Sequence, residues 1–581
     1  MVTGLGLSGM PQHRPSPRFE PDVVIVGSGA AGGMAAYALT RAGIKTLVLE
    51  AGRDYDPVSE SAMLKWNHEA PLRAIPTPDK SFGYYDATVG GGWEVPGEPY
   101  TSAPGTTFRW WRSRMLGGRT NHWGRHVPRF GPYDFKGKSR DGLGADWPIT
   151  YEDIAPYYDR TEKLIGVSGA NSGLENHPDS SPGVLQPPSK PRVPELMIQA
   201  AAAGLGIPCV PSRYAILTQP IDDAHAPRQA CFYATPCGRG CSIGAAFQTT
   251  TSLLPMAMGT GKLRIVTNAM VSRVLTDARG RAKGVEYFDR TNGSTHFVAA
   301  RVVVLAASAC ESAKILFNSH TAQSPQGLAN SSGQIGRSLM DSTGTDITGH
   351  IPALEGRPRY NEDGKDNAHL YIPFWLYKEQ AAGRLDFPRA YHYEIGGRFE
   401  MPGARFGLAG AEDGYGLSLK EDARRYYGAQ VSFSVRGEMV PNADSYCELD
   451  PDTKDKYGLP VLRFHWKWSD HETRQIAHGV KTAKEIIARM GGRVLTPEMP
   501  PEQAIQAGGE IIHEVGTTRM GMSATDSVTD GFGRTWDIDN LVIADGGVFP
   551  SNAHKNPTLT IMALSWRSMD HLTMRMRKGD I

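Results

Sequence analysis

The chain has 581 residues and a mass of 63.2 kDa, which is long for one hydrophobic core and predicts at least two joined domains. Its 62 basic and 61 acidic residues give a net charge of +1, so nothing indicates nucleic acid as a partner. With 40% hydrophobic residues and no run of about 18 apolar residues, the sequence predicts no membrane-spanning segment.

Residues 1–19 are the first element, and we expect them to form a loose arm. Their apolar region is too short for a signal peptide, and they have no cleavage-site pattern. Six cysteines in a chain of this length do not make a disulfide framework.

A nucleotide-binding pattern comes next. The apolar strand DVVIVG leads into Gly27-x-Gly29-x-x-Gly32, a helix rich in small residues, and a second strand that ends at Glu50. Gly27 permits a tight turn, Gly29 lets the backbone approach a pyrophosphate, and Gly32 lets the helix pack closely on the strand. The helix N-terminus at Ala30 faces the phosphates, and Glu50 is placed to accept hydrogen bonds from the adenosine ribose. These residues predict a dinucleotide-binding domain.

A helix and an unusual loop follow in the chain. Residues 146–169 predict an amphipathic helix that is capped at Thr150. The loop RQACFYATPCGRGCS, residues 228–242, holds three of the six cysteines. A disulfide would leave one thiol over, and a structural zinc site needs four ligands. Three thiolates, Cys231, Cys237 and Cys241, suit a [3Fe–4S] cluster, and buried structural thiols are the alternative.

Residues 346–504 are rich in aromatic and charged side chains. The stretches 428–440 and 457–468 alternate in polarity and predict antiparallel strands. Aromatic faces with polar edges suit a sugar ring, so this region is the expected substrate domain. The alternative is that most of these side chains form the core of a sheet. The residues concerned are Tyr360, Tyr371, Phe374, Trp375, Tyr377, Tyr391, His392, Tyr393, Arg424, Tyr426 and Tyr427.

Five segments, together with the N-terminal pattern, carry a family resemblance. They are GGRTNHWG at 117–124, VVVLAASACESAKILFNS at 302–319, IGRSLMD at 335–341, IIHEVGTTRMGM at 511–522 and NLVIADGGVFPSNAHKNPTLTIMA at 540–563. In this order they resemble the glucose–methanol–choline (GMC) family of FAD-dependent alcohol oxidoreductases. The resemblance spans essentially the whole chain, and it implies FAD as the bound dinucleotide.

The resemblance also implies a catalytic pair. It consists of His513 in the HxxGTxxMG motif and Asn556 in NPTLT. Oxidation of an alcohol moves a hydride to the flavin N5 and a proton to a base, and a neutral histidine suits that base near pH 7. The Asn556 amide can hold the alcohol oxygen without competing for the proton. His554 is a neighbouring histidine for which we expect a structural role.

Further cofactor contacts are implied by the same family. Asp545 and Gly546 are expected beside the flavin ribityl chain, and the segment from Asn556 to Thr558 against the isoalloxazine. The glycine-rich segment, with Gly118, Asn121 and His122, is expected to pass the reactive edge of the flavin. In the pyranose-oxidase branch, the histidine of a similar string is linked covalently to the flavin. Because the neighbouring residue differs here, we expect noncovalent FAD.

The expected fold is α/β. A discontinuous Rossmann-type FAD-binding domain is predicted from residues 20–60, 105–345 and 505–581, and it includes the cysteine loop. A substrate-binding domain, an antiparallel sheet with helices from residues 346–504, is predicted to cover the flavin.

The predicted function is that of an FAD-dependent dehydrogenase acting on a ring hydroxyl of a sugar or glycoside. The segments are most similar to bacterial glucoside 3-dehydrogenases, which implies C3 oxidation to a 3-keto sugar. Those relatives often have an extra cysteine where this chain has Phe232.

Electrons would pass from the cluster to a cytochrome c. A small export-chaperone-like subunit would carry the protein to the periplasm, and without such a partner we expect a cytoplasmic location. The alternatives are an oxygen-using pyranose or C-glycoside 3-oxidase without a cluster and, as a third class, a non-redox flavin lyase.

Overall fold

The computed structural model describes residues 19–581 except 61–66, 82, 86–87, 89, 234–236, 359–368, 398 and 400–415. All but the last residue of the predicted N-terminal arm therefore lies outside the described residues. So do Tyr360 and three residues of the cysteine loop.

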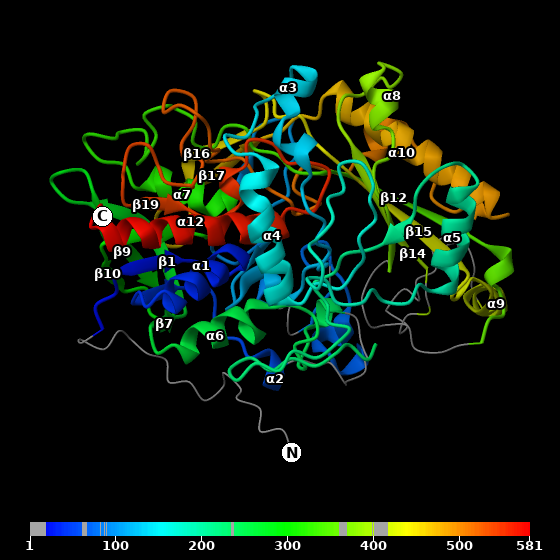
Figure 1. The fold of residues 1–581 in the computed structure, drawn as a ribbon, viewed down its shortest axis with the longest axis horizontal. Helices are drawn as coiled ribbons and strands as arrows, with labels where there is room; N and C mark the ends of the chain where they lie inside the picture. The colour runs from blue at the N-terminus through cyan, green and yellow to red at the C-terminus, as the bar shows by residue number, and fades with distance from the viewer. Residues whose placement is uncertain are drawn as a thin grey trace.

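A parallel sheet of five strands lies in the part of the molecule that contains the first and last elements (Figure 1). The strand order is β19-β11-β1-β2-β7, and β1 lies in the middle between β11 and β2. Every residue of β1 is buried, because the apolar run VVIV is covered on both faces of the sheet. The strands are β1 Val23–Val26, β2 Thr46–Leu49, β7 Leu263–Val266, β11 Val302–Leu305 and β19 Leu541–Ile543.

Helices and a small sheet pack around these strands. In Figure 1 the C-terminal helix α12 (Thr558–Lys578), in red, runs beside α1 (Ala30–Arg41), in blue. The Ser565 hydroxyl donates a hydrogen bond of 2.9 Å to the Ala31 carbonyl, so the two ends of the chain are joined directly. The small antiparallel sheet comprises β8 Ala269–Thr276, β9 Ala282–Asp289 and β10 Thr295–Ala299.

A six-stranded antiparallel sheet forms the second large layer, with β12, β14 and β15 on the opposite side of Figure 1 from β1. Helix α10 (Asp470–Arg489) packs on β12 and β15. The sheet takes its edge strand β6 from within the range predicted for the FAD-binding domain, and β12 begins before the predicted boundary. The strands in order are β18 Arg493–Val494, β12 Thr343–His350, β15 Gln430–Gly437, β14 Tyr391–Gly396, β13 Leu370–Ile372 and β6 Val210–Pro211.

The remaining elements lie outside these sheets. Helix α4 (Tyr151–Ile165) begins after Thr150, as predicted, and the Thr150 N–H donates to the Asp153 carboxylate at 2.8 Å. The predicted strand at 457–468 is β17, which pairs with β16 and β4 in a separate sheet. The other strands are β3 Gly91–Gly92, β4 Thr101–Ser102, β5 Arg112–Ser113, β16 Tyr446–Lys454 and β17 Pro460–His465. The other helices are α2 Pro57–Glu60, α3 Gly137–Asp141, α5 Val193–Ala203, α6 Leu253–Gly259, α7 Ala309–Asn318, α8 Tyr377–Ala381, α9 Gly416–Tyr426 and α11 Pro501–Ala504.

Two large hydrophobic cores result from this arrangement. One surrounds the parallel sheet and the other surrounds the six-stranded sheet. Among the described residues, no helix has both the length and the apolar character needed to cross a bilayer.

Candidate active site

A cavity of about 650 Å³ is lined by residues of both large sheets. It brings together most of the predicted site residues, although they come from distant parts of the sequence. Those that line it are Gly27, Gly29, Ala30, Glu50, Gly118, His122, His513, Asp545, Gly546, Asn556 and Thr558. Gly32 and Asn121 are not among the described residues that line it.

The three glycines after β1 have different surroundings. A Cβ on Gly27 would lie 2.5 Å from the Ala306 carbonyl oxygen, and its φ of +98° also requires glycine. A Cβ on Gly32 would lie 1.9 Å from the Gly27 carbonyl oxygen, so Gly32 permits the close packing of α1 on β1. A Cβ on Gly29 would have no neighbour within 4 Å. The open space above Gly29, at the N-terminus of α1, fits a pyrophosphate.

Glu50 is held in place by three donors of the protein. Its Oε2 accepts the Ser28 N–H at 3.1 Å and the Ser28 hydroxyl at 2.5 Å, and its Oε1 accepts the Gly52 N–H at 2.7 Å. Burial raises the pKa of this carboxyl above its ordinary value. The carboxylate therefore has a fixed orientation at the cavity wall, as the ribose contact requires.

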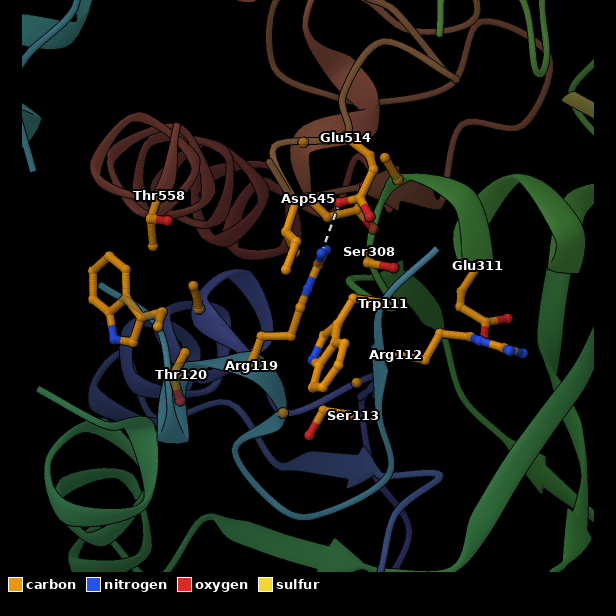
Figure 2. Close-up of a pocket in the computed structure, with 18 of the residues that line it drawn as sticks. Trp111, Arg112, Ser113, Arg119, Thr120, Ser308, Glu311, Glu514, Asp545 and Thr558 are labelled. Carbon is orange, nitrogen blue, oxygen red and sulfur yellow. Dashed lines mark hydrogen bonds and ion pairs between the residues drawn. The ribbon is translucent and has the colours of Figure 1, made fainter. Parts of the chain in front are cut away.

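Another part of the cavity wall is built from Asp545 and an ion pair that sequence reasoning missed. Asp545 accepts hydrogen bonds from the Ser312 hydroxyl at 2.5 Å and the Gly547 N–H at 2.9 Å, and burial raises its pKa to about 6. Figure 2 shows Arg119 extending to Glu514 beside Asp545; its Nη1 lies 2.6 Å from the Glu514 Oε2. Arg119 lies in GGRTNHWG and Glu514 in IIHEVGTTRMGM, but the sequence does not show that these two side chains form an ion pair.

Asn121 has a different position from the predicted cofactor contact. Its Nδ2 donates to the Leu116 carbonyl at 2.8 Å, and its Oδ1 accepts from the Thr250 hydroxyl at 3.3 Å. The side chain is fully buried and holds the turn Gly118–Asn121 together. Its role in this structure is therefore to shape the turn from the inside.

His513 and Asn556 lie together at the cavity. The His513 Nε2 is 3.5 Å from the Asn556 Nδ2, and its Nδ1 is 3.0 Å from the Ser342 hydroxyl oxygen. The His513 N–H donates to the Asp341 carboxylate at 2.9 Å, which fixes the backbone. Burial lowers the pKa of the imidazole from 6.5 to about 3, so the ring is neutral near pH 7. A neutral imidazole can act as a general base.

Asn556 is oriented by a carboxylate that sequence reasoning did not single out. Its Nδ2 donates to the Glu394 Oε1 at 3.0 Å, while its Oδ1 is buried and has no hydrogen-bond partner among the described residues. The amide thus keeps one acceptor for a bound ligand. Glu394 lies on β14 two positions after His392, so both face the same side of the sheet. In YHYEIG the polar residues His392 and Glu394 alternate with tyrosines, and this alternation was the signal in the sequence that could have indicated Glu394.

The aromatic side chains of the expected substrate domain form core. Phe374, Tyr377, Tyr391 and Tyr393 belong to the core around the six-stranded sheet, and Tyr371 is buried with its ring against His126 and His392. None of these five aromatic residues lines the cavity. From residues 346–504 the described cavity wall takes charged groups instead, namely Asp346, Glu394 and Arg436.

Sequence comparison identifies the family. Over 569 residues the chain is 30% identical to 2-methyl-1,2-propanediol dehydrogenase of Mycolicibacterium austroafricanum, with 96% of each chain covered. Two models described as GMC oxidoreductase match residues 198–343 and 441–565, and a model described as an FAD binding domain matches residues 22–59. The chain belongs to the GMC oxidoreductase family. The protein is thus an FAD-dependent oxidoreductase, and the predicted family is confirmed.

Other similar proteins agree with this assignment. The large subunit of fructose dehydrogenase from Gluconobacter japonicus is 28% identical over 587 residues, with 96% of this chain and 98% of that one covered. The solved structure of pyridoxine 4-oxidase from Mesorbium loti superposes with a TM-score of 0.62 at 17% identity, covering 95% and 99% of the two chains. This structural match confirms the fold class.

The cysteine loop of this GMC oxidoreductase packs behind the cavity wall. Cys237 and Cys241 are buried and Cys231 is half-buried, and all three belong to one small apolar cluster with Tyr214. The Arg125 guanidinium, which lines the cavity, donates to the Cys237 carbonyl at 3.1 Å. The same guanidinium donates to the Trp123 carbonyl at 2.6 Å and the Asn121 carbonyl at 2.9 Å. One buried side chain therefore joins the loop to the predicted flavin-contacting turn.

A second arginine gives the loop a positive surrounding. Arg228 is fully buried, and desolvation lowers its pKa to about 10, although the charge of a Cys241 thiolate counteracts this effect. Its Nη2 has no hydrogen-bond partner among the described residues. A buried positive charge beside Cys241 complements a negative one, so these residues fit an anionic, cysteine-bound group.

His122 is held by Trp111 in this GMC oxidoreductase. The Trp111 Nε1–H donates to the His122 Nε2 at 3.0 Å, and the rings meet edge to face with centroids 5.9 Å apart. Because Nε2 accepts this hydrogen bond, the neutral ring carries its proton on Nδ1. Both residues line the cavity.

Proposed function

We propose that the protein is a dehydrogenase that oxidises a ring hydroxyl of a sugar or glycoside, with His513 as the base. The observation that carries the proposal is the neutral imidazole of His513 at 3.5 Å from the Asn556 amide on the cavity wall. When bound, FAD supplies the acceptor for the hydride that leaves the carbinol carbon. The residues of the chain supply proton transfer and positioning.

The hydrogen bonds around His513 specify which nitrogen acts. With its proton on Nδ1 and donated to Ser342, the ring presents the Nε2 lone pair beside Asn556. Nε2 then accepts the proton of the substrate hydroxyl. The charge of Glu394 favours the imidazolium that forms, since this carboxylate raises the pKa of His513 against the larger effect of burial.

Sugar specificity is supported by the relatives and by the charged cavity wall. Fructose dehydrogenase of Gluconobacter japonicus, paromamine 6'-oxidase of Streptomyces fradiae and C-glycoside 3-oxidase of Arthrobacter globiformis carry sugar or glycoside substrates in their names. The carboxylates of Asp346 and Glu394 and the guanidinium of Arg436 offer both acceptors and donors to a hydroxylated ring. Oxidation at C3 is the regiochemistry that we propose from the family resemblance.

A [3Fe–4S] cluster on Cys231, Cys237 and Cys241 is the proposed exit for electrons. The shared cluster of these cysteines, the Arg228 guanidinium beside Cys241 and the Arg125 bridge to the cavity wall support it. Such a group supplies one-electron transfer, which matches a cytochrome c acceptor. A small export-chaperone-like subunit and a periplasmic location complete this proposal.

We propose that FAD is bound noncovalently. Trp111 engages the Nε2 of His122 and thereby places the proton on Nδ1, so neither ring nitrogen presents a free lone pair for a covalent bond.

Anaerobic absorption and EPR spectra of the purified protein test the function. Glucose, a disaccharide or a glucoside should bleach the flavin, and the His513→Ala variant should retain FAD but bleach about two to four orders of magnitude more slowly. His478→Ala is a matched control. The His478 Nδ1 lies 2.7 Å from the Tyr391 hydroxyl oxygen, and neither residue is among those that line the cavity. Bleaching at the normal rate in His513→Ala would remove the base assignment. Rapid reoxidation by oxygen in iron-free protein would favour the oxidase alternative.

A further inference from the structure

Three side chains beside the catalytic pair form a compact group of possible metal ligands. His126, His392 and Glu394 each offer one ligand atom, and these three atoms all lie within 4.8 Å of one another. His126 and His392 are 3% and 0% exposed, and Glu394 connects the group to Asn556 through a hydrogen bond of 3.0 Å. His126 and Glu394 thus line the cavity, and the two histidines have no role in the proton transfer described above.

The two distances from Glu394 match those of a first coordination shell, and the two histidine ligand atoms lie within 4.8 Å of each other. The Glu394 Oε1 lies 3.2 Å from the His126 Nδ1 and 3.6 Å from the His392 Nε2. Ligand atoms about 2.0–2.2 Å from a tetrahedral zinc ion lie about 3.4 Å from one another. The three atoms could thus contact one ion with only small movements.

The tautomer of His392 leaves a lone pair in this group. The His392 Nδ1 lies 2.5 Å from the His554 carbonyl oxygen, so Nδ1 must carry a proton and donate it. The neutral ring then directs the bare Nε2 toward the Glu394 carboxylate, which is also an acceptor. This Nε2 is buried and has no hydrogen-bond partner among the described residues. Metal-binding histidines commonly donate their other N–H to a backbone carbonyl in this way.

A neighbouring group provides a contrast. Asp134, Glu438 and His554 also place three potential ligand atoms within 4.8 Å of one another. There, however, the Lys555 ammonium lies 2.6 Å from Asp134 and the Arg389 guanidinium lies 2.9 Å from Glu438. The chain itself supplies the cations at that place.

In the first group no lysine or arginine of the described residues lies within ion-pair distance of Glu394, and the Arg436 guanidinium lowers the pKa of Glu394 only from farther away. For Glu394, the ion-pair partners in the described part of the chain are the two histidines alone. Two imidazoles and a carboxylate therefore surround a place that suits an external cation.

We propose that His126, His392 and Glu394 bind one divalent transition-metal ion of the zinc type. Three protein ligands leave a fourth position open, as in catalytic zinc sites. Because His126 and Glu394 line the cavity, that position faces the cavity. The ion would take a substrate hydroxyl oxygen there, next to the one that His513 deprotonates; only this last step rests on the proposed function.

Zinc binding by the FAD-loaded protein tests the proposal without any activity measurement. The protein is freed of metal with a chelator, dialysed against Zn²⁺ and analysed by elemental analysis and calorimetry. We expect one zinc ion per chain at this site. His392→Ala and Glu394→Gln should each weaken zinc binding about tenfold or more. FAD content and circular dichroism establish that each variant is folded.

Two control variants define the site. His465→Ala removes an exposed histidine that lies 2.9 Å from Glu448, and Cys237→Ser removes a thiol ligand from the other proposed site. Zinc bound by the His126 group should be unaffected by both. Crystals soaked in Zn²⁺ should show an anomalous peak between the three side chains. Absence of that peak, or equal zinc binding by wild type and His392→Ala, would overturn the proposal, even if sugar oxidation is established.

Discussion

Substitution of Gly29 and Gly32 by alanine should separate the space for a cofactor from the packing of the fold. The two positions lie three residues apart at the start of α1, and each substitution adds one methyl group. At Gly32 the new Cβ would lie 1.9 Å from the Gly27 carbonyl oxygen, and it needs at least 3.0 Å. Helix and strand would have to separate by about 1.1 Å there.

The expected energies differ accordingly. Overpacking of this kind costs about 1–3 kcal/mol or more, and at Gly32 we expect the upper end because the clashing atom is backbone. At Gly29 the Cβ has no neighbour within 4 Å, so stability should change only by the cap preference, at most about 1 kcal/mol. That methyl group would occupy the place where the pyrophosphate approaches, so FAD affinity should fall at least about tenfold, or 1.4 kcal/mol.

Denaturant unfolding of the FAD-free protein measures the first quantity, and FAD titration followed by fluorescence measures the second. We expect Gly29→Ala to unfold nearly like wild type but to bind FAD weakly. Gly32→Ala should lose stability whether or not FAD is present. Wild-type FAD affinity in Gly29→Ala, or wild-type stability in Gly32→Ala, would refute this division of roles.

Five further predictions concern the site. Because burial lowers the pKa of His513 from 6.5 to about 3, kcat/KM should stay flat from pH 7 down to about pH 5, and an acid limb near 6.5 would contradict this. Between about pH 6.5 and 3 the unfolded chain binds a proton at His513, whereas the folded protein does not. The contribution of His513 to the free energy of unfolding should therefore be lost as the pH falls through this range, which unfolding measured at several pH values can test. Asn556→Ala should slow flavin reduction less than His513→Ala does; an equal or larger loss would mean that the amide does more than position the alcohol. Cys237→Ser should leave flavin reduction by sugar intact but abolish cytochrome reduction, and unchanged cytochrome reduction would remove the relay. Noncovalent FAD should appear in the supernatant after denaturation, whereas a yellow precipitate would indicate a bond to His122.

The sequence predicts best those features that depend on local backbone. Gly27, Gly29 and Gly32 differ in the space around their Cα atoms, and the GxGxxG spacing made it possible to predict a tight turn, an open approach and a close helix–strand contact at these three positions. The cap at Thr150 was predictable for the same reason. Fold class and family followed from motifs that are each contiguous in the chain.

Features that depend on distant partners were harder to predict. Glu394 contacts Asn556 across 162 positions, and Arg119 contacts Glu514 across 395. No local pattern specifies such pairs. Asn121 illustrates the converse, since its position in a cofactor-contacting motif did not reveal that its amide turns inward to Leu116. The aromatic residues near Tyr391 likewise had the composition of a sugar site but serve as core.

The strand order β19-β11-β1-β2-β7 has a consequence for synthesis of the protein. The nucleotide-binding glycines are synthesised early, yet β1 pairs with β11, residues 302–305, and β11 in turn pairs with β19, residues 541–543, and both strands are synthesised much later. Asp545 and Asn556 follow later still, as does α12, which packs on α1 through contacts such as that of Ser565 with Ala31. Pairings so distant in sequence form slowly and leave strand edges exposed meanwhile. The wall of the FAD cavity is therefore incomplete until Asp545, Gly546, Asn556 and Thr558 have been synthesised, so the complete cofactor site can form only after nearly all of the strands are present.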